Sequence, residues 1–191
     1  MFHDARPIRS MLVPVVTACA LAACDGADPV AEPDRLAPTA PAQATVKAAM
    51  NQGLATFRRA TAAYHDVAAA RADGFVQILP CLENPDGEGG LGIPFARLDR
   101  FDATIDLSEP EILFYEPQEN GRLRLVGGEP VVPVDAWTGE APPSLFGREF
   151  HRNDAHGLYG LHMWIWHHNP DGIFAFWHPD VTCEFAAEQA A

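Results

Sequence analysis

Positive charge is scarce in this chain: 13 Lys and Arg residues stand against 26 Asp and Glu residues, for a formal net charge of −13 at pH 7. Nucleic acid is excluded as a partner, because phosphate binding needs clustered positive charge. Adsorption to an anionic lipid surface through basic residues is excluded for the same reason. Any attachment to a membrane therefore has to be covalent.

The sequence also lacks the motifs of the common catalytic classes. It has no CxxC pair for redox chemistry and no HExxH pair for a zinc protease. Ser144 does not lie in a GxSxG turn, and no Lys-Ser/Thr pair that would bind phosphate follows the glycine-rich segment 89–92. No reaction is identified by a motif.

A lipoprotein signal is present near the N-terminus. The apolar stretch 11–23 follows two arginines and ends in the tetrapeptide Leu-Ala-Ala-Cys, whose cysteine is Cys24. This stretch is too short to cross a bilayer as a permanent helix, so residues 1–23 are predicted to be a lipoprotein signal peptide. Cys24 is then the acylated first residue. We predict an exported protein, held by its lipid on the periplasmic side of a cell-envelope membrane.

Removal of the signal peptide leaves 168 residues (191 − 23) with 11 basic and 25 acidic side chains, because Arg6, Arg9 and Asp4 are lost. That length fits one domain with a proper core. We predict an acylated cysteine and a disordered Pro/Ala-rich tether at 24–44. A single domain at 45–186 and a frayed tail at 187–191 follow.

The number of cysteines, four, also fits an exported protein in an oxidising compartment. Cys19 lies in the signal peptide and Cys24 is used by the lipid, which leaves Cys81 and Cys183. Two remaining thiols in an oxidising compartment usually pair. We predict a Cys81–Cys183 disulfide, which stabilises the fold by roughly 4 to 5 kcal/mol in the chain-entropy model.

Two patterns predict an α+β fold. Residues 45–72 lack proline and carry apolar side chains at helical spacing, which predicts one long amphipathic helix. Gly53 weakens this helix unless it allows close packing. Farther along, 112–115 and 123–126 are predicted to pair as a hairpin around Asn120-Gly121. The predicted architecture is one long N-terminal helix packed on an antiparallel sheet of short strands, with a single disulfide.

A second turn signal lies near the C-terminus. Asn169-Pro170-Asp171-Gly172 fits a type I turn followed by a glycine with positive φ, and 159–168 and 173–178 are predicted to be its paired arms. Trp164 is then opposite His178. One side, which we call the Trp/His face, carries His162, Trp164, Trp166, His168, Phe174, Phe176 and His178. The opposite face, with Leu161, Met163 and Ile165, is assigned to the core under the helix.

The remaining segments are predicted as strands and connections. Residues 75–79 and 131–134 are further strands, the second at a sheet edge because it contains a proline. The glycine-rich segment 83–92 is predicted to be a flexible loop, and the acidic run 99–111 a solvated connection. The stretch 136–157 is either a lid over the Trp/His face or an ordinary covering loop.

The leading functional hypothesis is a non-catalytic module that binds a small molecule or an envelope protein. Its proposed binding surface is the aromatic part of the Trp/His face, formed by Trp164, Trp166, Phe174 and Phe176. Large aromatic side chains are favoured in binding pockets. The Trp/His face does not pack against the predicted helix, so it is available for binding.

The alternative hypothesis is a metal-dependent enzyme. His162 and His178 are diagonal neighbours on the predicted hairpin, and Asp180 lies opposite His162. Two imidazoles and a carboxylate, with His156 as a further candidate, can hold a divalent ion such as zinc. Histidines beside aromatic residues also serve as hydrogen-bonded packing residues, and this second interpretation stays open.

The chain resembles a family of exported bacterial proteins for which no activity is known. The matching segments are 60–67 (ATAAYHDV), 72–75 (ADGF), 109–116 (EPEILFYE), 145–147 (LFG), 161–166 (LHMWIW) and 169–172 (NPDG), together with Cys183. The family's glycine-rich segment usually reads Gly-Met-Gly-x-His, whereas this chain has Pro94 at the histidine position. The resemblance implies a shared fold across the folded part and no mechanism.

Overall fold

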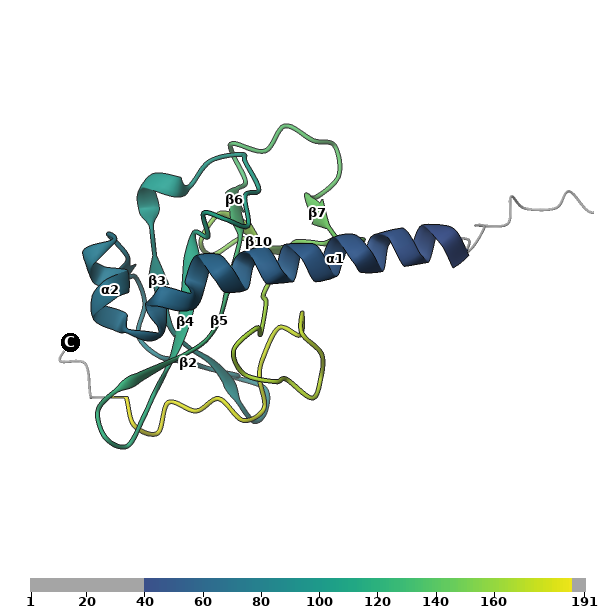
Figure 1. Ribbon diagram of the computed structural model, residues 1–191. Helices are drawn as coiled ribbons and strands as arrows, with labels where there is room; N and C mark the ends of the chain where they lie inside the picture. The colour runs from purple at the N-terminus through teal and green to yellow at the C-terminus, as the bar shows by residue number, and fades with distance from the viewer. Residues whose placement is uncertain (1–39, 187–191) are drawn as a thin grey trace, which may run out of the picture. The chain divides into compact units, whose positions relative to one another are not determined.

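A computed structural model of the chain describes residues 40–186 (Figure 1). Cys24, the predicted signal peptide 1–23, the first part of the predicted tether and the tail 187–191 lie outside the described residues. The elements are α1 (Ala40–Thr61), η1 (Ala62–His65), α2 (Val67–Ala72), β1 (Val76–Gln77), β2 (Leu82–Glu83), β3 (Gly90–Ala96), η2 (Leu98–Arg100), β4 (Ile112–Pro117), β5 (Leu123–Glu129), β6 (Val131–Pro133), β7 (Ser144–Leu145), β8 (Arg148–Glu149), β9 (His151–Asn153) and β10 (Leu158–Gly160). The α+β class with antiparallel sheets is confirmed.

The helical region differs from the prediction at both ends of α1. This helix begins at Ala40, within the predicted tether, because the segment is alanine-rich and Pro41 is tolerated in a first helical turn. The predicted single helix 45–72 is divided after Thr61 into a 3-10 turn and α2. Asp66 has an extended backbone and its side chain accepts a hydrogen bond from the Ala68 N–H at 2.9 Å, so it caps α2 as a new helix.

The main sheet is antiparallel, in the order β1-β3-β4-β5, with β2 also paired to β3. Its β4–β5 hairpin turns at Asn120-Gly121, as predicted, and Gly121 has φ +76°. Segment 90–92 is part of the buried strand β3 and not of a flexible loop. Gly92 has φ +81°, and a Cβ there would lie 2.5 Å from the Tyr115 carbonyl oxygen, so glycine permits this close pairing.

Two cores cover the two faces of this sheet. The first core packs against α2 and η1. Its members from the sheet side are Phe75, Ile93, Phe95, Leu113, Tyr115 and Leu125. The Tyr115 hydroxyl donates to the Tyr64 carbonyl oxygen at 2.6 Å and ties the sheet to η1. On the other face, Leu91, Ile112, Phe114, Val126, Val131, Trp164 and Val181 form a second cluster. This second face is therefore covered by the C-terminal segment.

The helix α1 packs on the segment that follows β10. Its Leu54 and Phe57 pack in one cluster with Met163 and Ile165, which confirms this part of the predicted apolar face, whereas Leu161 packs in a separate cluster with Val132, Phe150 and Tyr159. Gly53 permits close packing: a Cβ at this position would lie 2.2 Å from the Phe146 ring. This close packing explains why glycine, a poor helix former, is tolerated inside α1.

The predicted C-terminal hairpin is wrong in its pairing, although its turn forms. The Gly172 N–H donates to the Asn169 carbonyl at 3.1 Å, and Gly172 has φ +113°. However, Tyr159 pairs with β6 on one side and β9 on the other, in the sheet β6-β10-β9. His178 instead forms a bridge with Gly90. A four-residue turn is fixed locally, whereas the partner of each arm is decided by which strand edges are available.

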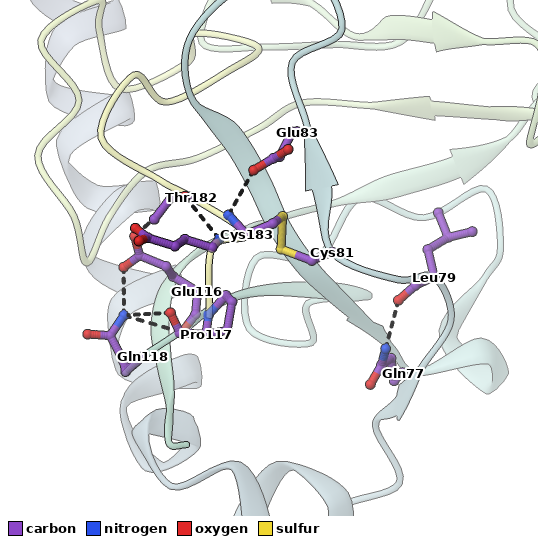
Figure 2. Close-up of a disulfide and its surroundings, with 10 residues drawn as sticks. Gln77, Leu79, Cys81, Glu83, Glu116, Pro117, Gln118, Thr182 and Cys183 are labelled. Carbon is purple, nitrogen blue, oxygen red and sulfur yellow. Dashed lines mark hydrogen bonds between the residues drawn. A yellow bond between two sulfur atoms is a disulfide. The ribbon is translucent and has the colours of Figure 1, made fainter. Parts of the chain in front are cut away.

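The Cys81–Cys183 disulfide is confirmed, with a Cα–Cα distance of 5.7 Å (Figure 2). It joins the chain before β2 to the C-terminal segment. Beside it the Cys183 N–H donates to Glu83 Oε1 at 3.2 Å, and the Thr182 N–H donates to Glu116 Oε1 at 3.3 Å. The covalent bond and two hydrogen bonds thus fasten the C-terminal segment to the main sheet.

Candidate metal centre

A cavity of about 450 Å³ is bounded by the main sheet, by the sheet β6-β10-β9 and by the C-terminal segment. Most of its lining is aliphatic or aromatic: Ile78, Leu79, Leu82, Leu91, Pro94, Leu98, Phe101, Ile112, Phe114, Val131, Leu158, Phe176 and Trp177. Its polar lining side chains are Glu129, His151, Asn153, His156 and His162, and no Lys or Arg of the described residues lines it. The cavity is an apolar chamber with one titratable wall.

Three of these polar side chains converge on one point. Glu129 Oε2 lies 3.3 Å from His162 Nε2 and 4.0 Å from His151 Nε2. The glutamate ends β5, His151 begins β9, and His162 follows β10 by two residues. Gly160 pairs with His151 and makes room for the carboxylate, because a Cβ there would lie 2.3 Å from Glu129 Oε2. The strand register therefore builds this group from three distant segments.

The backbone fixes the tautomer of His162. Its Nδ1 lies 2.6 Å from the Phe176 carbonyl oxygen. A carbonyl oxygen only accepts, so Nδ1 carries the hydrogen, and in the neutral ring Nε2 presents its lone pair to Glu129. An imidazole held in this way through its other nitrogen is the usual arrangement of a metal-binding histidine.

Burial keeps the two imidazoles neutral. It lowers the pKa of His162 to about 3, with a smaller effect from His151, and it also lowers the pKa of His151. Burial, and then the charge of Glu111, raises the pKa of Glu129 to about 8. None of the three groups therefore supplies a positive charge near pH 7, and the site has two free nitrogen lone pairs beside a carboxyl group.

The carboxyl oxygen of this site is left without a hydrogen bond. Among residues 40–186, Glu129 Oε2 is the only buried side-chain oxygen or nitrogen with no hydrogen-bond partner. A proton on Glu129 would satisfy one histidine lone pair, whereas a cation would satisfy all three ligand atoms. Two ligands, each about 2.0–2.1 Å from a tetrahedral ion, lie about 3.3 Å apart. The Glu129–His162 distance of 3.3 Å fits such an ion.

A second group, formed by His167, His178 and Asp180, is less suited to a metal. His178 Nδ1 accepts the Asp180 N–H at 3.1 Å, so its Nε2 carries the hydrogen and donates to the His168 carbonyl, also at 3.1 Å. Neither nitrogen has a free lone pair. In addition, Arg124 donates to His167 Nδ1 at 3.2 Å and brings a positive charge. These histidines are satisfied packing residues.

The structure separates the four metal ligands predicted from the sequence. His162 belongs to the first group, whereas His178 and Asp180 belong to the second. The Trp164 ring lies between the two histidines, with its centroid 6.4 Å from that of His162 and 5.0 Å from that of His178. His156 lines the cavity but belongs to neither group. The predicted His162/His178 pairing fails because it depended on the hairpin register.

Sequence reasoning missed two ligands, Glu129 and His151. Glu129 is an isolated acid between two apolar strands, and this was the signal that could have identified it. His151 lies in the stretch 136–157, for which a lid or an ordinary covering loop was predicted. That stretch contains β7, β8 and β9, and it supplies a wall of the cavity.

The four aromatic residues predicted to form one binding face are dispersed. Trp164 is buried in the core against Phe114. Trp166 donates its indole N–H to Thr61 Oγ1 at 3.0 Å under α1. Phe174 packs beside Phe146, and only Phe176 lines the cavity. The single aromatic face is therefore corrected to one cavity residue and three packing residues, because the two arms form no ladder and are joined by one backbone hydrogen bond, from the Trp164 N–H to the Ile173 carbonyl oxygen at 2.9 Å.

Comparisons with protein-family models, with curated proteins and with solved structures find no match for this chain. The resemblance to exported bacterial proteins therefore stays a prediction. Within residues 40–186, no helix has both the length and the apolar character needed to span a membrane.

Proposed function

We propose that this protein is a lipid-anchored envelope protein that binds a small molecule through a divalent metal ion such as zinc. Glu129, His151 and His162 are the proposed ligands, and the apolar cavity is the proposed binding chamber. The observation that carries the proposal is the buried, unpartnered Glu129 Oε2, which lies 3.3 Å from the lone pair of His162 Nε2. Export and the acylation of Cys24 are part of the same proposal.

The donor set favours zinc-type chemistry over a purely structural site. Structural zinc sites usually have four protein ligands, whereas sites that act on a small molecule have three and an open position. Two imidazoles and one carboxylate are a common form of the open type. All three proposed ligands line the cavity, so a molecule inside it can occupy the open position.

Metal analysis tests the proposal directly. Full-length protein, purified without a histidine tag, is expected to bind about one zinc ion per chain. Glu129→Gln removes the anionic ligand at nearly constant shape, so zinc affinity in a chelator competition should fall at least 100-fold. His156→Ala is the matched control, because His156 lines the same cavity outside the ligand group.

Circular dichroism in EDTA is expected to show that both variants retain the fold. The proposal is wrong if the wild type binds zinc no better than Glu129→Gln does.

A metal-dependent enzyme is the second candidate, and it is favoured by His156. Apart from the three proposed ligands, His156 is the only titratable side chain of the described part of the chain that lines the cavity. It is thus the available general base for a water on the metal ion. Zinc-dependent hydrolysis of a small nitrophenyl ester, lowered about 100-fold in kcat by His156→Ala with KM unchanged, would favour the enzyme over the binding protein.

A further inference from the structure

The charge of the proposed metal site limits what can share the cavity with the ion. A divalent cation with one carboxylate and two neutral imidazoles has a net charge of +1. Among residues 40–186, no Lys or Arg lines the cavity, and Glu129 is the only carboxylate that does. A net charge in an apolar chamber is costly, so a ligand with a single negative charge is favoured over a neutral, cationic or doubly anionic one.

Glu111 acts on this site only from outside the cavity. Its carboxyl oxygen accepts the Val131 N–H at 3.2 Å, and the side chain lies against the separate polar depression that includes Arg97 and Arg100. It is not among the residues that line the cavity. The charges nearest the open coordination position are therefore those of the ion and its own ligands.

The remainder of the chamber fits a hydrocarbon tail. Away from the ligands its wall consists of aliphatic and aromatic side chains, including Leu79, Leu91 and Leu98. A cavity of about 450 Å³ lies within the usual range for small-molecule sites. Leu98, whose side chain is 57% exposed, marks the solvent side of this wall.

We propose that the cavity binds an amphipathic monoanion, with a carboxylate on the metal ion at Glu129, His151 and His162 and an apolar tail along the leucine-lined wall. This inference rests on the proposed metal site and deepens it by naming the class of ligand. A medium-chain carboxylate such as octanoate is the simplest molecule of this class. Binding is non-covalent, and the carboxylate replaces water at the open coordination position.

Octanoate binding to the full-length zinc-loaded protein tests the inference, with Trp177 fluorescence and calorimetry as readouts, since Trp177 lines the cavity. EDTA should weaken octanoate binding at least tenfold, and octanol should bind at least tenfold more weakly than octanoate. Each CH₂ removed from the tail should lower affinity about fourfold, from about 0.8 kcal/mol per buried CH₂, so butyrate should bind about 200-fold more weakly.

A pair of variants separates tail binding from metal binding. Leu98→Ala shortens the wall and should weaken octanoate about fourfold, with zinc affinity unchanged. Val76→Ala is the matched control, because Val76 is similarly exposed, at 49%, and does not line the cavity.

The two proposals fail in different ways. If zinc binds but octanoate binds equally well with EDTA, or octanol matches octanoate, the ligand class is wrong and the metal site stands. If zinc itself does not bind, both are wrong.

Discussion

Removal of the Cys81–Cys183 disulfide should lower the unfolding free energy of this protein by several kcal/mol. The two residues are 102 positions apart, so the bond closes a long loop in the unfolded chain. In the chain-entropy model, a loop of this size is worth about 4 to 5 kcal/mol. Whole domains have unfolding free energies of about 5 to 15 kcal/mol, so this loss would be a large part of the total.

The test compares wild type with Cys81→Ala, Cys183→Ala and the double variant, by urea unfolding at low temperature. All three variants lose the same bond, so their unfolding free energies should agree within about 1 kcal/mol. Agreement assigns the effect to the cross-link and not to either side chain. A loss below about 1 kcal/mol in all three would refute the chain-entropy reasoning for this protein.

The same substitution should also weaken the proposed metal site. The C-terminal segment supplies the Phe176 carbonyl that orients His162, as well as the cavity residue Trp177. When the segment is released at Cys183, the population with His162 correctly oriented should fall. Zinc affinity is therefore expected to decrease at least tenfold in the double variant, by chelator competition at a temperature where it is folded. Unchanged zinc affinity would show that the orientation of His162 does not depend on the disulfide.

Three further predictions concern α1, the buried histidines and the anchor. Gly53→Ala should destabilise the protein by about 1 kcal/mol, because its Cβ would lie 2.2 Å from the Phe146 ring and 2.9 Å from the Leu107 Cδ1. With Phe146→Ala present only the Leu107 contact is left, so the same substitution should cost less, and a urea double-mutant cycle without such coupling would contradict this. Burial lowers the pKa of His178 below its ordinary value of 6.5, so the unfolded state gains a proton first as pH falls. Each such histidine should then lower stability below pH 6.5 by up to about 1.4 kcal/mol per pH unit, so His178→Gln should reduce the slope by one histidine's share in unfolding measured from pH 7 to 5, while the buried His151 and His162 still contribute. Cys24→Ala should move the protein from the membrane fraction to the soluble envelope fraction and abolish palmitate labelling; unchanged fractionation would refute the anchor.

Features fixed by neighbouring residues were predictable from the sequence. The β4–β5 hairpin, the Asn169 turn and the apolar face under α1 depend on residues a few positions apart. The disulfide was predictable because two cysteines remain after the signal peptide and the lipid are accounted for, and two such thiols usually pair in the predicted oxidising compartment. Strand β3 was missed because it is buried on both faces and contains two glycines, so it shows neither alternation nor high β-propensity.

The metal ligands depended on long-range register, and the sequence pattern does not encode it. His162 was identified because it lies close to the C-terminal turn. Glu129 and His151 join it only because β10 lies between β6 and β9, which aligns Gly160 with His151 and with Val131. The predicted hairpin paired 159–168 with 173–178, whereas 158–160 pair with β6 and β9, and that error moved the predicted site from His151 to His178.

The proposed metal site depends on the proposed export through the C-terminal segment. Residues 161–186 contain no named strand or helix, yet they provide His162, the carbonyl that orients it and part of the cavity wall. A segment without a ladder of its own is held by its links to the main sheet: the bridges of Met163 to Gly128 and of His178 to Gly90, the backbone hydrogen bonds of Thr182 and Cys183, and the disulfide. That bond forms only under oxidising conditions. In a reducing cytosol the segment would lose its covalent link, and so the metal site should reach full affinity only after the protein has left that compartment.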